Sequence, residues 1–160
     1  METMPITKSG YEKLKRELEH LKKVEVPENV RAIEEARAHG DISENAEYAA
    51  AKERQSFIQG KIQEIENNLA TSKVIDLKDL TDERAVFGST VSIQDVDNDD
   101  VIRYQLVGPC ESDISKNRIS VTSPIGKALI GKEIGDIVKV KTPGGVRELE
   151  IIDISIIEES

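Results

Sequence analysis

Two acidic residues three positions apart, Asp41 and Glu44, are the residues of this sequence best suited to chemistry. They lie in the segment HGDISENAEY, residues 39–48. An Asp-x-x-Glu pair can form a capping box at a helix start, but Ser43 or Asn45 could cap the same helix equally well. Carboxylates also bind Mg²⁺, although two are too few for an ion that wants about six oxygens. If the acids have a chemical role, they complete a site supplied by another macromolecule, holding a second Mg²⁺ beside phosphates already there.

Three basic residues, Arg37, Lys52 and Arg54, flank this segment on both sides. They are either ordinary surface charges paired with neighbouring glutamates or a small patch that touches a phosphate backbone. The net charge of −9 argues against a general nucleic-acid binder, because such proteins gain affinity by displacing counterions with lysine and arginine. Any contact with nucleic acid is therefore indirect or confined to a small basic patch.

Two other segments match binding motifs only in part. GKALIGK (126–132) has the G-x-x-x-x-G-K spacing of a phosphate loop, but Glu133 follows where Ser or Thr should reach magnesium. The acidic run at 95–100 lacks the glycine and the glutamate that a calcium loop requires. We therefore predict a short helix and turn for the first segment and a solvated hairpin turn for the second.

Cysteine and histidine offer no metal site within the chain. Cys110 is the single cysteine, so no internal disulfide or thiolate cluster can form. His20 and His39 lie too far apart along a predicted helix to share a metal. Neither a long apolar run nor a secretory signal is present. We expect a cytoplasmic, monomeric protein that makes no membrane contact.

The acidic segment follows a long predicted helix. Ser9 and Glu12 match a capping box at its start, with Thr7 as a competing cap, and Gly40 suits its C-terminus. Pro27 interrupts the pattern and predicts either a bend or a break. The apolar face is predicted to contain Leu14, Leu18, Leu21, Val30, Ile33 and Ala36.

A second long helix is predicted after the acidic segment. Its seam residues alternate in three- and four-residue steps, as in a coiled coil. These positions are Tyr48, Ala51, Gln55, Ile58, Ile62, Ile65 and Leu69. Two long helices joined by a few residues must run antiparallel to bury their seams on each other. A helix of about 30 residues spans roughly 45 Å, so the acids are expected at the tip of a rod.

The second half of the chain has a different pattern, with valine and isoleucine alternating with polar residues. It predicts strands at 86–96, 101–108 and 118–123, and a hairpin over 136–154 that turns at Pro-Gly-Gly. A short helix is expected at 123–131, capped by a serine and started by a proline. The predicted fold class is α+β, with a coiled-coil hairpin over 1–76 (tip about 40–46) and a small, mainly antiparallel domain over 80–160.

The segment GDISENAEYAAAKERQ (40–55) closely resembles the tip signature of the Gre family of bacterial transcript cleavage factors. The likeness extends to PITKSGYEKLKREL before this segment and to VFGSTV, SPIGKALIGKEIGD and VKTPGG after it. It therefore covers essentially the whole chain, with the motifs in the family's order. Several independent motifs make this resemblance specific. In having few basic residues, the chain resembles the less basic of the family's two types, the one that acts on short backtracks.

The resemblance implies a C-terminal domain with an FKBP-like fold that docks on RNA polymerase, while the coiled coil enters the polymerase's secondary channel. The factor would meet the nascent RNA 3′ end and the DNA template only within that complex. It would be an accessory rather than an enzyme, with no cofactor of its own, and would act on Mg²⁺ of the polymerase active site when the polymerase has backtracked.

The resemblance also implies roles for individual residues. Asp41 and Glu44 would stabilise the weakly held second Mg²⁺ and position water for cleavage of the transcript. The remaining signature positions would support the tip (Ser43, Asn45, Tyr48) or contact extruded RNA (Arg37, Lys52, Arg54).

Three other functions compete with this interpretation. A Gre-like protein could instead block the polymerase channel, although intact Asp41 and Glu44 favour cleavage. A peptidyl-prolyl isomerase needs stacked aromatic residues, and residues 80–160 contain only Phe87 and Tyr104. A helical-hairpin chaperone or scaffold would keep its activity without the tip acids.

Overall fold

The computed structural model describes residues 3–40 and 45–157 of the 160-residue chain. Contacts divide the chain into two compact units. One, the hairpin unit, is Tyr11–Thr71. The other, the β unit, joins the N-terminal segment through Gly10 to the chain from Ser72 onward. The sequence patterns did not indicate that the first residues belong with the C-terminal part.

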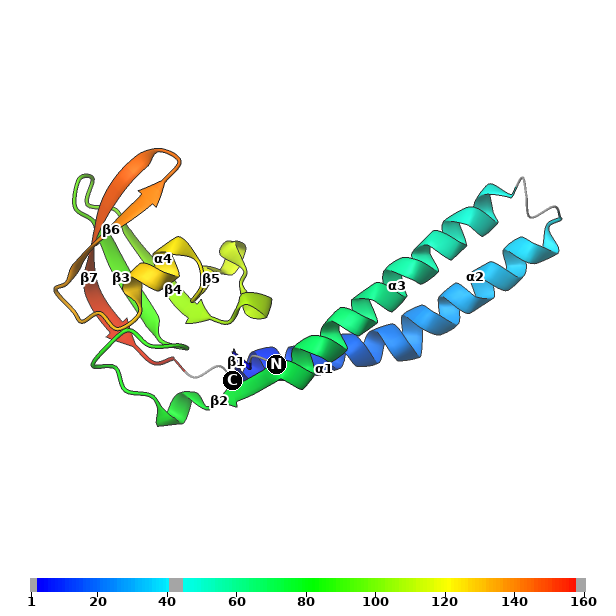
Figure 1. Cartoon of the computed structure of the whole chain (residues 1–160), viewed down its shortest axis with the longest axis horizontal. Helices are drawn as coiled ribbons and strands as arrows, with labels where there is room; N and C mark the ends of the chain where they lie inside the picture. Colours follow the sequence, from blue (N-terminus) through cyan, green and yellow to red (C-terminus); the bar gives the residue numbers. More distant parts are fainter. Residues whose placement is uncertain (1–2, 41–44, 158–160) are drawn as a thin grey trace. The chain divides into compact units, whose positions relative to one another are not determined.

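The hairpin unit consists of two helical arms that lie side by side (Figure 1). The first arm is α1 (Lys8–His20), the π turn η1 (Leu21–Glu25) and α2 (Val26–Ala38), and the second is α3 (Ala46–Thr71). Polar contacts join early residues of one arm to late residues of the other, as between Lys22 and Glu66, 3.4 Å apart. The predicted antiparallel hairpin is confirmed.

Pro27 neither breaks nor ends the first arm. Proline has no N–H, and in an α-helix its ring collides with the carbonyl four residues earlier. The π turn η1, directly before α2, contains one extra residue and shifts hydrogen bonding to the fifth residue back. Accordingly, the Val26 N–H donates to the Leu21 carbonyl. The chain passes Pro27 as a continuous helix with a locally wider turn.

The extra residue of η1 also shifts which positions of α2 are buried. Asn29, Ile33 and Ala36 are buried, whereas Val30 is 43% exposed. The prediction that Val30 lies on the apolar face is therefore wrong, while Ile33 and Ala36 are confirmed. Asn29 takes the position between them and donates from Nδ2 to the Ala51 carbonyl of α3 at 3.0 Å, which satisfies the amide inside the helix interface.

The seam predicted for α3 is confirmed at every position. Its members are buried (Ala51, Ile58, Ile65) or half-buried (Tyr48, Gln55, Ile62, Leu69). On the first arm, Leu14 and Leu21 are buried and Leu18 is half-buried. No described helix combines the length and the apolar content needed to cross a membrane.

The β unit contains two sheets. A parallel pair joins β1 (Met4–Thr7) to β2 (Ser72–Ile75). The larger sheet has the strand order β5-β4-β3-β7-β6. Its strands are β3 (Thr90–Asp95), β4 (Val101–Val107), β5 (Arg118–Ser120), β6 (Ile137–Thr142) and β7 (Gly145–Ser155). The pairing is antiparallel except between β4 and β5, so the α+β, mainly antiparallel prediction is confirmed.

One face of the larger sheet forms the apolar core with the short helix α4 (Pro124–Leu129). Ser123 caps α4 by accepting from the Gly126 N–H at 3.1 Å, as predicted. The G-x-x-x-x-G-K run is thus a short helix and turn rather than a phosphate loop. The described part of the unit also contains the 3₁₀ turns η3 (Leu77–Asp79), η4 (Pro109–Glu111) and η5 (Ile114–Lys116).

The structure changes the predicted start of one strand and confirms the predicted hairpin turn that follows it. The strand predicted from residue 86 begins only at Thr90, because the Ser89 N–H and the Val86 carbonyl close a turn first. The acidic run after β3 is a hairpin turn, as predicted. The Asp95 carboxylate accepts from the Asp97 N–H at 2.9 Å and from Arg147 Nε at 2.7 Å. These contacts lower the pKa of Asp95, the Asp97 bond more than the arginine.

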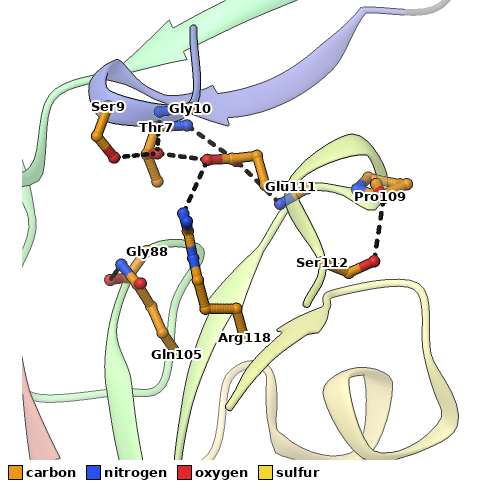
Figure 2. Close-up of polar contacts among 10 residues, drawn as sticks. Thr7, Ser9, Gly10, Gly88, Gln105, Pro109, Glu111, Ser112 and Arg118 are labelled. Atoms are coloured by element: carbon orange, nitrogen blue, oxygen red, sulfur yellow. Dashed lines mark hydrogen bonds and ion pairs between the residues drawn. The ribbon is translucent and has the colours of Figure 1, made fainter. Parts of the chain in front are cut away.

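The start of α1 depends on a buried carboxylate from a distant part of the chain (Figure 2). Thr7, not Ser9, caps the helix, because its Oγ1 accepts from the Gly10 N–H at 3.1 Å. The Thr7 N–H and hydroxyl both donate to Glu111, 104 residues away. Glu111 also accepts from the Gly108 N–H at 3.2 Å and pairs with Arg118 at 3.2 Å. Of the two caps that the sequence offered, Thr7 is therefore confirmed and Ser9 is wrong.

Candidate functional site

The segment between α2 and α3 carries the predicted acids. Asp41, Ser43 and Glu44 lie outside the described residues. The described residues nearest to them are Gly40, which has a φ of +122° that favours glycine, and Asn45. The site can therefore be built from the two helix ends that present the acidic segment.

Asn45 links the two helix ends. Its Oδ1 accepts from the Tyr48 N–H at 3.0 Å, which makes it the N-cap of α3. Its Nδ2 donates to the Ala36 carbonyl of α2 at 2.5 Å, and the same carbonyl accepts from the His39 N–H at 3.2 Å. The Asn45 amide thus forms hydrogen bonds with a backbone carbonyl at the end of α2 and a backbone N–H at the start of α3, groups that helix ends leave without a partner within the helix.

The cap at Asn45 bears on one of the alternatives for Asp41 and Glu44, that of a capping box for α3. A capping box would place Asp41 at the N-cap of α3 and Glu44 in its first turn. Helix α3 starts at Ala46, directly after Asn45. Capping of α3 therefore does not account for the two acids.

Tyr48 and Arg37 form a second contact between the two arms. The guanidinium carbon of Arg37 lies 5.8 Å from the centroid of the Tyr48 ring, within cation–π range. Tyr48 is half-buried and Arg37 is exposed. The contact holds an exposed cation beside the end of α2, because the face of an aromatic ring attracts positive charge.

The other two predicted basic residues differ from each other. Lys52 Nζ donates to the neutral Gln55 side chain of the same helix at 2.7 Å and forms no ion pair with a described residue. Arg54 instead pairs with Glu25 on the first arm at 2.5 Å. Arg54 thus matches the alternative of a surface ion pair, although its partner is not one of the neighbouring glutamates that the sequence suggested.

No three metal-ligating side chains of histidine, cysteine or acidic type converge anywhere in residues 3–40 and 45–157. Cys110 is half-buried, and this burial raises the pKa of its thiol, which keeps it in the unreactive protonated form. Spacing within the sequence could not have revealed the Asn45–Ala36 and Arg37–Tyr48 contacts, because each depends on how α2 and α3 meet.

Two family models match nearly the whole chain. Residues 4–74 match the transcription elongation factor N-terminal model, and residues 80–156 match the GreA/GreB C-terminal model. The chain belongs to the GreA/GreB family of transcription elongation factors. Its relatives include "Transcription elongation factor GreA" of Syntrophus aciditrophicus, which is 68% identical over 98% of this chain and 97% of the relative. The corresponding GreA of Phenylobacterium zucineum is 55% identical over 94% and 96%.

Among solved structures, the crystal structure of GreA factor homolog 1 (Gfh1) of Thermus thermophilus is similar to this chain at 29% identity, with a TM-score of 0.44. The comparison covers 96% of this chain and 99% of that one. The resemblance that the tip signature indicated is confirmed by the family models and by the GreA relatives.

Proposed function

We propose that this elongation factor is an accessory of RNA polymerase that stimulates the polymerase's own cleavage of the RNA 3′ end in backtracked complexes. The near full-length match to GreA relatives supports the class of function. The observation that carries the mechanism is the cap at Asn45, because it fills the structural role that could have explained the acids.

Asp41 and Glu44 are the residues assigned to metal binding. Together they offer up to four carboxylate oxygens, fewer than the six that Mg²⁺ prefers, so the remaining ligands come from the polymerase and the RNA phosphates. Asp41 and Glu44 would hold a Mg²⁺ ion there, which would supply charge neutralisation at the phosphate and a more acidic bound water. The two carboxylates also accept hydrogen bonds from the attacking water and orient it.

Arg37 and Lys52 are the residues assigned to contact with extruded RNA. Both lie near the acidic segment in sequence, and neither forms an ion pair with a described residue. Their charge is thus available for phosphates. Arg54 is the weakest of the three predicted contacts, since its guanidinium already pairs with Glu25.

The decisive experiment measures transcript shortening in a stalled, backtracked polymerase complex supplied with Mg²⁺. Asp41→Asn and Glu44→Gln should each slow cleavage by about 100-fold, the upper range for a weakened metal site, while still binding the polymerase. Glu53→Gln is the matched control, because Glu53 is exposed on α3, and it should cleave like the wild type. Normal cleavage by both tip variants would refute metal delivery.

The same assay tests the basic residues and the rival functions. Arg37→Gln and Lys52→Gln should weaken cleavage most in complexes with more extruded RNA, while the exposed Arg31→Gln on α2 serves as control. A wild-type protein that suppresses cleavage would indicate a channel-blocking inhibitor. Turnover in a proline-isomerisation assay, or suppression of aggregation that survives loss of the acids, would point to the other two classes.

A further inference from the structure

The β unit contains an open cavity of about 350 Å³ on the side of the sheet opposite the apolar core. It is lined by Thr90, Arg103, Gln105, Lys116, Asn117 and Ile157. This volume lies within the range of small-molecule sites, roughly 300–1,000 Å³. Neither the tip acids nor the tip basic residues contribute to the cavity, so its role does not rest on the function proposed above.

Strand register places the polar side chains of the cavity on one face. Thr90 of β3 lies directly opposite Gln105 of β4, and Arg103 is two residues from Gln105, so all three point to the same side. The next residues along each strand, Val91 and Leu106, belong to the core on the other side. The sheet therefore holds a cation, an amide and a hydroxyl in fixed positions.

The turn formed by η5 and its C-cap residue Asn117 adds a second cation. The Asn117 carbonyl accepts from the Gln105 N–H at 2.9 Å, which ties the turn to β4. Asn117 has a left-handed φ of 54°, a conformation that asparagine tolerates. This turn brings Lys116 to the same cavity as Arg103. Two positive side chains from separate segments thus converge.

Neither cation is neutralised within the described part of the chain. Arg103 and Lys116 are both exposed and form no ion pair with a described residue, and none of the described residues that line the cavity carries a carboxylate. Two acids of β7 lie on the same face: Asp153, two strand spacings or about 10 Å from Arg103, and Glu150, which lies opposite Gln94 further along β3. Asp113, near Lys116, accepts from the N–H and the hydroxyl of Ser115. In a chain of net charge −9 the cavity is a local positive site.

Buried donors without partners flank the cavity on both sides. Among the described residues, the buried polar side-chain atoms that lack a hydrogen bond are Ser155 Oγ and Arg118 Nε. By register, Ser155 lies opposite Thr90, and Arg118 lies beside Gln105 (Figure 2). Buried polar groups are nearly always hydrogen-bonded. Ser155 and Arg118 lie beside the lining residues rather than among them, and both are donors on the face that carries Arg103 and Lys116.

We propose that this face of the β unit binds a small phosphate-bearing anion of the pyrophosphate type, either free or as part of a nucleotide. Guanidinium, ammonium, hydroxyl and amide groups are the donors that bind phosphate oxygens in proteins. Two cations that form no ion pair with a described residue match an anion that carries at least two negative charges. Ile157 provides an apolar wall against which the base of a nucleotide could rest.

The test is an NMR titration of the ¹⁵N-labelled full chain with sodium pyrophosphate, without divalent cations and at constant ionic strength. Saturable shifts should centre on Thr90, Arg103, Gln105 and Asn117. Arg103→Gln and Lys116→Gln should each weaken binding at least about fivefold, the effect of losing one charge-assisted hydrogen bond. Lys141→Gln, the same change on the exposed edge strand β6, should bind within about twofold of the wild type.

Both cavity variants replace exposed side chains, and their unperturbed spectra would show that they fold. A parallel titration with ATP distinguishes the two sources of phosphate, since tighter binding of ATP than of pyrophosphate would indicate a nucleotide. The proposal is overturned if no saturable shift occurs at millimolar pyrophosphate, or if both cavity variants bind as tightly as Lys141→Gln. Binding of single-stranded RNA alone, with no response to pyrophosphate or ATP, would also overturn it.

Discussion

Replacing Glu111 with glutamine should destabilise the β unit strongly, although the change keeps the shape of the side chain. The Glu111 side chain is 2% exposed. One carboxylate oxygen accepts from the N–H groups of Thr7 and Gly108, and the other accepts from the Thr7 hydroxyl and Arg118. Every partner is a donor, so an amide nitrogen in either position faces another donor.

The magnitude follows from the partner that remains. The Arg118 side chain is only 15% exposed, and removing one member of a buried ion pair typically costs 3–5 kcal/mol because the other charge stays buried and unpaired. Small domains are stable by about 5–15 kcal/mol in total. We therefore expect Glu111→Gln to lower the free energy of unfolding of the β unit by about 3–5 kcal/mol.

Hydrogen exchange is the suitable measurement, because the chain has two compact units and a single unfolding free energy is not defined for such a chain. The protection free energy of amides in β3 and β4 should fall by the same amount, about 3–5 kcal/mol, whereas that of amides in the middle of α3 should change little. Glu148→Gln is the matched control. Glu148 is 43% exposed and lies 3.8 Å from Lys139, so its loss should cost at most about 1 kcal/mol.

A loss of protection in β3 and β4 no larger than that of the Glu148 control would refute this reasoning. It would mean that the four donors find other acceptors when the charge is removed. An equal loss in α3 and in the β strands would also contradict it, because the effect would then not be specific to the β unit.

Three further changes test other parts of the structure. Asn45→Ala should lower protection of the Tyr48 amide in hydrogen exchange by about 1–2 kcal/mol, through loss of the cap and of the bond to α2; an unchanged rate would show that Asn45 does not hold the helix ends. Gly10→Ala should lower the melting temperature despite better helix propensity, because its Cβ would lie 2.6 Å from Glu111 Cδ, whereas Gly60→Ala, with open space around it, should gain about 1 kcal/mol. Arg147→Gln removes one of the contacts that lower the pKa of Asp95 in the folded state. The stabilisation that comes with a lowered carboxyl pKa is fully present above the ordinary value of about 3.9. It is lost as pH falls through the lower pKa of the folded state. By hydrogen exchange, the amides of β3 and β7 should therefore be less protected in the variant than in wild type at pH 7 and should differ less at pH 3, and a constant difference would argue against this role.

Local patterns were sufficient for much of the hairpin unit. The seam of α3 could be predicted because one helix brings residues three and four apart onto one face, whatever it packs against. The Ser123 cap of α4 and the hairpin at Pro143 and Gly144 were predictable for the same reason, since each depends only on neighbouring residues. The error at Val30 arose because a polar residue, Asn29, takes the buried position and is satisfied there by the Ala51 carbonyl of α3, a contact that the apolar pattern of one helix does not reveal.

The sequence by itself determined the family, the two helical arms, the α+β class and the choice of Asp41 and Glu44 as candidate ligands, because these depend on residue types at short spacing. Only the tertiary structure decided that Asn45 caps α3 and also holds α2, and that Arg37 lies on the ring of Tyr48. It alone joined the start of α1 to Glu111 across 104 residues, and it alone gathered Arg103 and Lys116 at one cavity. Such contacts follow from the way strands and helices meet in space, and no local spacing in the chain encodes them.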